Sequence, residues 1–414
     1  MTTTRREFLK QSAILAGGTA LPFRAGRHRR IPAPEAKSRV VSVASKDLLV
    51  EGKYNPVAVR GTFDAGMKEL TGLKTGADAW SSLFSPDDVV GIKINCIGAP
   101  KISSSLESIN AAVEGLKAAG VKENNIIIWD RADREFPRTG LVINKSTAGI
   151  RVMGASVFPE SIVPWAEGYD RSVYVSFEDG TLKKFRELMG RGLTRDGGHR
   201  DIFNSVTWLW ILARQGNEKA KKYDAEIRRL YNDYSDREGI KKIAEEVADQ
   251  FNDVTIEDEE KSFFANIVTK EITKLVNIAV LKHNEDSGVT WATKNIGLGV
   301  TTNKVRFHID YCTRAISEIL AMPCLKNKMV LHIGEAAKIS TVSVAGARLA
   351  YDNRIFFSRD PVAMDRIGLD ILEEKRQAQG LESVRDISTH VAACARRGLG
   401  TDDLARIELR ALSI

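Results

Sequence analysis

Several ionisable side chains directly follow one apolar stretch at residues 274–281. The side chains that could do chemistry there are Lys282, His283, Glu285, Asp286, Thr290, Lys294 and Asn295. An imidazole can give or take a proton near neutral pH. Lysine ammonium groups bind carboxylate or phosphate oxygens. We therefore predict that His283 and Lys294 are catalytic, and that Lys282, Thr290 and Asn295 bind the ligand.

A second apolar stretch, residues 87–96, also carries polar side chains near its end, Lys93 and Asn95. We predict that Lys93 and Lys294 hold an anionic group and that Asn95 contacts the same ligand. A lysine at the end of a strand can instead extend its amine into solvent, which leaves a structural alternative for Lys93. The functional interpretation requires Lys93, Lys294 and His283 to meet at one rim of a sheet and to enclose a cationic pocket.

The segment after residue 284 resembles a strand that passes into a helix. Ser287 is a candidate N-cap, Gly288 permits close approach of the backbone, and we expect a helix to start near Val289. The backbone N–H groups of such a helix would point at an anion. In that helix Thr290 and Lys294 would share one face, and the lysine could reach back toward the strand end.

The elements that must position these residues alternate between strand and helix. Apolar runs predict strands at residues 38–45, 87–96, 124–131, 274–281, 328–336 and 353–361, and helical spacing predicts helices at residues 57–71, 103–120, 310–322 and 362–377. A strand, a helix and a strand in succession predict parallel pairing with a right-handed crossover. The fold class is therefore α/β, with a mostly parallel sheet flanked by helices. No G-x-G-x-x-G turn supports a dinucleotide site.

The middle of the chain has a different pattern. Residues 181–269 are charged and show helical spacing, so we predict a helical insertion in the middle of the chain. The apolar run at residues 201–212 would pack on the sheet or cover a pocket. The predicted organisation is a leader at 1–36, a first part of the α/β domain at 37–180, the insertion at 181–269, and a second part at 270–414.

Composition excludes several classes of protein. Of the net charge of +7, residues 1–36 carry +5, so the remainder is nearly neutral and nucleic acid is not an expected partner. Four cysteines stand far apart, which favours buried free thiols over a cluster or zinc site, although the even number permits disulfides in an exported protein. No stretch is long and apolar enough to predict a stable membrane span.

The N-terminal segment resembles a bacterial twin-arginine export signal. Thr4 to Lys10 follows the pattern over seven consecutive positions, with Arg5 and Arg6 ahead of the apolar run 13–23. The resemblance implies that the twin-arginine translocase is a partner and that the protein is periplasmic or extracellular. Such passengers fold before export, often around a cofactor. An amphipathic first helix is the alternative.

Three segments together resemble the family called domain of unknown function 362 (DUF362). They are "VGIKINC" with Lys93 and Asn95, "LKHNEDSGVTWATKNIGLG" from residue 281, and "SRDPVAMDRIG" with Asp360 and Asp365. His308 stands where the family often has a histidine, so the resemblance implies that His308 and Asp365 contact ligand. We expect Asp360 to cap the helix that begins at Pro361, and Asp365 to pair with a site lysine. Ferredoxin-type cysteine runs, present in some relatives, are missing here.

A weaker resemblance concerns lactate racemase-like proteins. They place a histidine ahead of a glycine-containing loop and a lysine that holds a nickel pincer cofactor, and His283 and Lys294 have a similar separation. Several side chains here are of metal-ligating types, but no spacing fixes a metal site, so metal and cofactor stay open.

Two functional classes follow from the sequence. The first is an exported enzyme that acts on a small carboxylate- or phosphate-bearing molecule. The second is a periplasmic binding or cofactor-carrier protein without turnover. An enzyme of this kind should lose activity in a His283→Gln variant, whereas a carrier should tolerate that change and lose ligand in Lys294→Ala.

Overall fold

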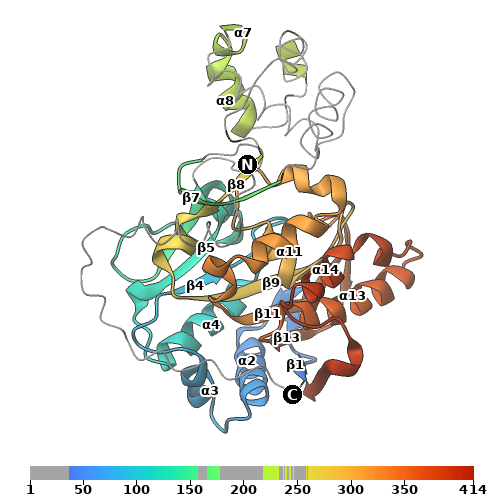
Figure 1. The fold of residues 1–414 in the computed structure, drawn as a ribbon. Coiled ribbons are helices and arrows are strands. Elements are labelled where there is room, and N and C mark those ends of the chain that lie inside the picture. The colour runs from blue at the N-terminus through green and yellow to red at the C-terminus, as the bar shows by residue number, and fades with distance from the viewer. Residues whose placement is uncertain are drawn as a thin grey trace, which may run out of the picture. The chain divides into compact units, whose positions relative to one another are not determined.

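The described residues of the computed structural model are 37–156, 166–177, 218–232, 260–414 and a few positions between 236 and 258. They form a ten-stranded sheet in the order β14-β1-β13-β11-β9-β4-β5-β6, with β10 paired to β9 and β12 to β11 (Figure 1). Its strands are β1 Ser38–Ala44, β4 Val90–Lys93, β5 Ile126–Ala132, β6 Arg151–Ser156, β9 Lys274–Asn284, β10 Gly288–Thr290, β11 Met329–Val342, β12 Arg348–Tyr351, β13 Arg354–Ser358 and β14 Ile407–Ser413. The neighbours β11, β9, β4, β5 and β6 are parallel, and β13 pairs antiparallel with β11 and β1. The predicted mostly parallel sheet is confirmed.

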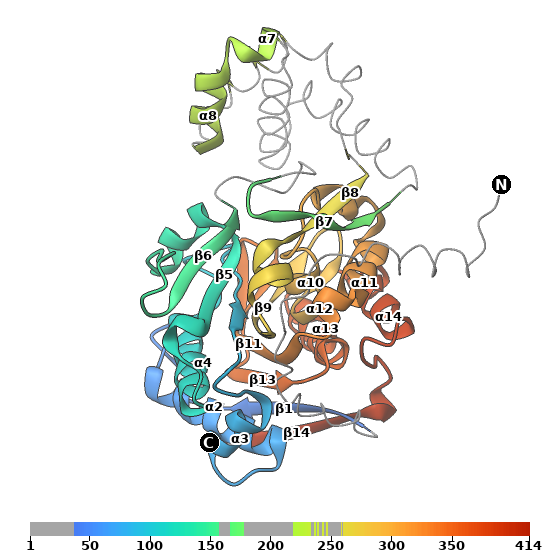
Figure 2. The same ribbon diagram turned by 60° about the vertical axis from the view of Figure 1, so that its left-hand side comes forward.

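Helices cover both faces of this sheet (Figure 2). One face carries α2 Pro56–Thr71, α3 Gly76–Leu83 and α4 Leu106–Ala118, and the other carries α10 Ala292–Gly297, α11 Thr313–Ala321, α13 Pro361–Gln377 and α14 Thr389–Arg396. Alternate residues of β9 point into the two cores, because successive side chains of a strand face opposite ways. Val276 and Ile278 join the core with α2, α3 and α4, whereas Leu275 and Ala279 join the other. This two-sided burial explains why the strand is apolar without interruption.

Polar residues begin the principal helices at the positions that the sequence indicates. The Ser105 hydroxyl accepts a hydrogen bond from the Ser108 N–H at 3.1 Å and starts α4. Asp360 Oδ1 accepts from the N–H groups of Val362 and Ala363 at 2.9 and 2.8 Å, just ahead of Pro361. These contacts satisfy N–H groups that lack an acceptor within the helix. The predicted N-cap of α13 is confirmed.

The chain reverses its direction across the sheet between β4 and β9. From β4 it passes through α4 to β5 on one side, whereas from β9 it passes through α10 and α11 to β11 on the other side. The carboxyl ends of β4 and β9 therefore border the point where open α/β sheets usually leave a crevice for ligand. The loop between β4 and α4, residues 94–105, starts at this point and is called the β4–α4 loop below.

The predicted insertion is helical only in part of the range that the structure describes. Residues 218–221 and 224–232 form α7 and α8, as expected. Lys261–Ala265 instead forms strand β8, which pairs antiparallel with β7, Tyr169–Ser176, and Phe263 and Phe264 are fully buried. The helical prediction is wrong at these residues because their apolar side chains enter the main core. The apolar run 201–212 lies outside the described residues, and the predicted domain boundaries stay predictions.

Short elements complete the described part of the chain. They are β2 Leu49–Val50, β3 Lys53–Tyr54, η1 Glu123–Asn125, η2 Asp133–Thr139, η4 Ile267–Glu271, η5 Val305–Asp310, α12 Pro323–Lys326, η6 Arg385–Ile387 and η7 Leu404–Arg406. All four cysteines are free thiols; Cys96, Cys312 and Cys394 are buried and Cys324 is partly buried, as predicted for most of them. The leader 1–36 lies outside the described residues. Within the described residues no helix has the length and apolar character needed to cross a membrane.

Candidate functional site

Lys282 lies between the carboxyl ends of β4 and β9, in a buried region that we call the crevice although side chains fill it. Its side chain is fully buried, and its ammonium donates to Asn95 Oδ1 at 2.6 Å, to the Ile102 carbonyl at 2.8 Å and to the Ile97 carbonyl. Burial lowers the pKa of this amine to about 7, and the charge of Asp130 opposes the shift. All three acceptors belong to the β4–α4 loop. Lys282 therefore fastens this loop over the crevice that a ligand would otherwise enter.

A chain of amide side chains continues from Lys282 across the crevice. Asn95 Nδ2 donates to Asn295 Oδ1 at 3.0 Å, and Asn295 Nδ2 donates to Asn277 Oδ1 at 2.7 Å. Asn277 Nδ2 donates to the Ala292 carbonyl at 3.1 Å. The amides are buried, and such a network is stabilising when its members are satisfied. The structure thus brings together the predicted residues Asn95, Lys282 and Asn295, but as partners of one another.

Lys93 lies beside this network and points toward β5. Its ammonium, with a side chain that is 1% exposed, forms an ion pair with Asp130 Oδ1 at 2.6 Å and donates to the Ile94 carbonyl at 2.6 Å. Asp130 also accepts from the Cys96 N–H at 2.7 Å. Burial raises the pKa of Asp130, but the Lys93 charge outweighs it and the pKa is lowered. A Cβ on Gly299 would lie 2.5 Å from Lys93 Cε, so the glycine gives this side chain room.

The hairpin after β9 differs from the helix start that we expected. Residues 288–290 form β10, paired antiparallel with β9, and α10 begins three residues later than predicted, at Ala292. Ser287 is therefore not an N-cap, and Thr290 lies in a strand opposite Lys282 rather than on a helical face with Lys294. The apolar residue Val289 explains why a strand forms here instead of a helix. It is fully buried, and it pairs with His283 across the two strands.

Lys294 reaches back to the end of β9, as predicted. Its ammonium donates to Asn284 Oδ1 at 2.8 Å and to the Ser287 hydroxyl. Lys93 ends β4 and Lys294 lies in α10, and their amines contact different parts of the protein, Asp130 and the hairpin. The two amines share no hydrogen-bond partner among the contacts described above.

His283 is mostly buried on the opposite face of β9 from Lys282. Its Nδ1 accepts a hydrogen bond from the Ser343 N–H at 3.2 Å, so the ring proton of the neutral form sits on Nε2. Burial, followed by the positive charge of Arg376, lowers the pKa of His283 to about 4. The ring is neutral at neutral pH. It can accept a second proton only by giving up its bond from Ser343.

Asp365 supports α10 and does not pair with a lysine. Its carboxylate accepts from the N–H groups of Ala292 and Thr293 at 2.6 and 3.0 Å and from the Thr293 hydroxyl. Burial raises its pKa to about 7, against the effect of these donors. The prediction that Asp365 pairs with a lysine is wrong, because its carboxylate caps α10, the helix that carries Lys294 and Asn295. Asp365 is thus a positioning residue in the observed geometry.

The remaining predicted residues stand apart from this network. His308 is half-buried in the 3-10 turn η5, and Thr290 is buried with no hydrogen-bond partner for its hydroxyl. Among the described residues, no group of three or more His, Cys, Asp or Glu side chains is arranged to hold a metal ion. The nickel and ligand roles inferred from resemblance stay predictions.

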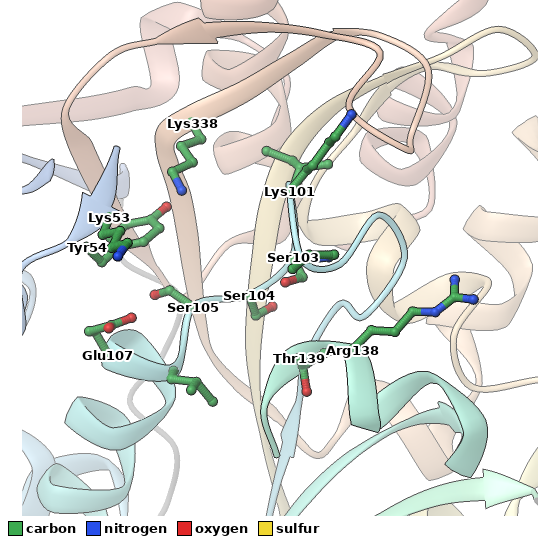
Figure 3. Close-up of a pocket in the computed structure, with 13 residues that line it drawn as sticks. Lys53, Tyr54, Lys101, Ser103, Ser104, Ser105, Glu107, Arg138, Thr139 and Lys338 are labelled. Carbon is green, nitrogen blue, oxygen red and sulfur yellow. The ribbon is translucent and has the colours of Figure 1, made fainter. Parts of the chain in front are cut away.

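A pocket of about 230 Å³ lies on the outer side of the β4–α4 loop, in front of α4 (Figure 3). It is lined by Lys53, Tyr54, Pro100, Lys101, Ile102, Ser103, Ser104, Ser105, Leu106, Glu107, Arg138, Thr139 and Lys338. Figure 3 shows Lys338 and Tyr54 on one side of the first turn of α4, and Arg138 with Thr139 on another. We call this cavity the α4 pocket. Its volume suits a small molecule, since drug-sized sites are larger.

Four cations line the α4 pocket, and none forms an ion pair with the described carboxylates. Lys53, Lys101 and Arg138 are exposed, whereas Lys338 is half-buried. Burial lowers the pKa of Lys338, and the charges of Glu335 and Glu107 oppose this. The helix α4 adds the partial positive charge of its N-terminus on the same side. The pocket is therefore cationic, with Glu107 as the carboxylate among its lining residues.

The network in the crevice holds the wall of this pocket. Lys282 binds the carbonyls of Ile97 and Ile102, and Ser104 donates to the Ile278 carbonyl of β9 at 2.7 Å. The Ser104 hydroxyl also accepts from the Asn95 N–H at 2.8 Å. The predicted residues thus position the pocket without lining it. Sequence reasoning missed the pocket, although the run "KISSSLES" at the start of a helix was a signal that could have located it.

Comparison with known proteins agrees with part of the sequence resemblance. Residues 209–370 match the family described as Domain of unknown function (DUF362). The match includes the segments around Lys282–Asn295 and Asp360–Asp365, but not Lys93 and Asn95.

No curated protein matches the chain. A solved structure of a protein from Thermotoga maritima, a Northeast Structural Genomics Consortium target, is 8% identical with a TM-score of 0.35 over 80% of this chain. The chain spans 61% of that protein, and a likeness this low carries no argument. Residues 209–370 are thus similar to the DUF362 family.

Proposed function

We propose that this protein binds a small anionic molecule, a carboxylate or a phosphate, in the α4 pocket. The observation that carries the proposal is the set of four cations around one cavity, without a carboxylate partner among the described residues. Elsewhere in the described structure many lysines and arginines end on acidic side chains, as Lys274 does on Asp88. Cations that line a cavity without such partners favour a ligand that supplies the negative charge.

The walls of the pocket add hydrogen-bond donors to this charge. Ser103, Ser104 and Ser105 belong to the lining. The hydroxyls of Ser104 and Ser105 already donate to the Ile278 carbonyl and to Glu335, so the Ser103 hydroxyl and the N–H groups of the first turn of α4 that lack an acceptor within the helix are the donors left for a ligand. Phosphate and carboxylate groups bind well to such a combination of helix N-terminus, hydroxyl and ammonium. The β4–α4 loop is fixed by Lys282 from beneath, so these donors are arranged before any ligand arrives.

The proposal is tested by measuring the binding of inorganic phosphate and of sulfate by isothermal titration calorimetry. Lys338→Gln should weaken phosphate binding roughly tenfold or more, because a hydrogen bond to a charged group contributes about 1.5–3 kcal/mol. Lys74→Gln, which removes the same charge from an exposed residue outside the pocket, is the matched control and should bind as the wild type does. Absence of saturable binding, or equal loss in both variants, would contradict the proposal.

An enzyme that moves a proton is the second candidate. The sequence favours it through His283 and Lys294, and the neutral His283 ring with its fixed tautomer can donate a hydrogen bond from Nε2. This role, and direct anion binding by Lys93 and Lys294, stay predictions. The contacts of Lys93 with Asp130 favour support of the β4 end over ligand binding.

We also propose export through the twin-arginine pathway to the periplasm or beyond. The support is the seven-position pattern from Thr4 to Lys10 ahead of a short apolar run. Replacing both Arg5 and Arg6 by lysine should retain the protein in the cytoplasm, as measured by cell fractionation and immunoblotting. The single change Lys10→Arg keeps the charge and serves as control. Unchanged export of the double variant would overturn this proposal.

A further inference from the structure

A buried carboxyl group lies directly behind the α4 pocket. Glu335 of β11 is fully buried and is not among the residues that line the pocket. Its carboxylate accepts hydrogen bonds from the Ser105 N–H at 3.1 Å, from the Ser105 hydroxyl, and from the Ser108 hydroxyl at 2.7 Å. An ionised Glu335 would thus place one negative charge at the N-terminus of α4, beside the pocket where we propose that a second one binds.

Ser105 connects this carboxyl group to the pocket. The Ser105 side chain lines the cavity and also bonds to Glu335. An anion that contacts Ser105 would therefore be separated from Glu335 by a single hydroxyl group. Charges at such a short separation in a poorly solvated site interact strongly. Two full negative charges on the two sides of Ser105 are unfavourable unless one of them takes up a proton.

The other charged groups around Glu335 come from four elements. Tyr54 of β3 and Lys338 of β11 flank it, Glu107 stands in the first turn of α4, and Lys282 of β9 lies at longer range. Burial raises the pKa of Glu335 against the effect of the Ser105 and Ser108 donors, and the charge of Glu107 raises it further. Burial also raises the pKa of Tyr54, so this phenol keeps its proton near neutral pH.

We propose that Glu335 takes up a proton when an anion binds in the α4 pocket, so that ligand binding and protonation of this buried carboxyl group are coupled. This inference rests on the proposed function of the pocket. Coupling of this kind is reciprocal, so a fall in pH strengthens the binding of an anion whose own charge does not change. The neutral carboxyl group keeps its place because it still accepts from Ser108 and can donate to the Ser105 oxygen.

Calorimetry with inorganic sulfate tests the coupling, because sulfate keeps a fixed charge near neutral pH and any proton taken up belongs to the protein or the buffer. The full chain is titrated in buffers of different ionisation enthalpy at the same pH. The wild type should take up a substantial fraction of one proton for each sulfate bound. Glu335→Gln, which keeps an acceptor for the serines, should bind sulfate with almost no uptake. Glu107→Gln removes a carboxylate at the pocket itself; it should keep the uptake and move its pH range downward, because the Glu107 charge raises the pKa of Glu335.

A second variant keeps the test decisive if Glu335→Gln does not fold. Ser108→Ala removes one donor to the Glu335 carboxylate without changing a lining residue, so the pH range of proton uptake should move upward. Sulfate binding without proton uptake in the wild type, or uptake that persists in Glu335→Gln or is lost in Glu107→Gln, overturns the coupling. No binding of sulfate or phosphate to the wild type instead overturns the proposed function of the pocket.

Discussion

The crevice between β4 and β9 and the α4 pocket lie on two sides of the same loop, and both are rich in lysine. In the crevice, the amines of Lys93 and Lys282 end on atoms of the protein, namely Asp130, Asn95 and backbone carbonyls. In the pocket, Lys338 and the neighbouring cations form no ion pair with a carboxylate of the described residues. A lysine at the end of a strand therefore does not by itself identify a ligand site. The identity of its partner decides whether it holds the fold or faces a ligand.

The two regions nevertheless depend on each other. The β4–α4 loop forms the roof of the crevice with the carbonyls of Ile97 and Ile102 and the wall of the pocket with Ser103 to Ser105. A change in the crevice should therefore affect both stability and the pocket, whereas a change of an exposed cation in the pocket should affect binding alone. Variants on the two sides of the loop test this division.

Loss of the buried ion pair in the crevice should lower the free energy of unfolding more than the other substitutions considered below. Lys93→Met leaves the Asp130 carboxylate buried without its cation, and removal of one partner of such a pair costs about 3–5 kcal/mol. The free energy of unfolding in urea measures this loss. The double variant Lys93→Met with Asp130→Leu should recover much of it, because no unpaired charge remains.

The matched control for this comparison is Lys53→Met in the pocket. Lys53 is exposed and forms no ion pair with the described carboxylates, so its replacement should change the free energy of unfolding by no more than about 0.5 kcal/mol. If Lys93→Met and Lys53→Met had equally small effects, the crevice would not be the rigid support that we describe.

Much of the fold was predictable because its signals are local. The apolar run 274–281 can be buried on both faces only in a covered sheet, and Ser105 and Asp360 stand at the helix starts that their side chains favour. The hairpin at residues 288–290 was missed because a glycine after polar residues suits a helix start as well as a turn. Only the pairing of Val289 with His283 on β9 distinguishes the two.

The candidate site was less predictable because its residues are distant in the sequence. That Lys93 and Lys282 lie near the same end of the sheet follows from the strand order, in which β4 and β9 are parallel neighbours. That Asp130 and the Ile102 carbonyl satisfy them depends on the path of a loop, which no spacing records. The pocket in addition needs Lys338 from β11 and Arg138 from η2, which carry no shared motif.

The last prediction concerns the pH dependence of stability and distinguishes the crevice from the pocket. Burial lowers the pKa of Lys282 to about 7, whereas an unfolded lysine has a pKa near about 10.4. Between these two values the unfolded chain binds more protons than the folded protein, so this residue makes the protein more stable as the pH rises. Its contribution to the slope approaches about 1.4 kcal/mol per pH unit in that window and vanishes below it.

Lys282→Met should remove this contribution to the slope, whereas Lys53→Met should leave the slope unchanged. The measurement is the free energy of unfolding in urea at several pH values above neutrality. If wild type and Lys282→Met gave parallel curves, the three acceptors around the amine would be holding it charged throughout. The crevice would then carry its positive charge at every pH tested. It would differ from the pocket only in that its lysines bind protein atoms, whereas the cations of the pocket do not pair with a described carboxylate.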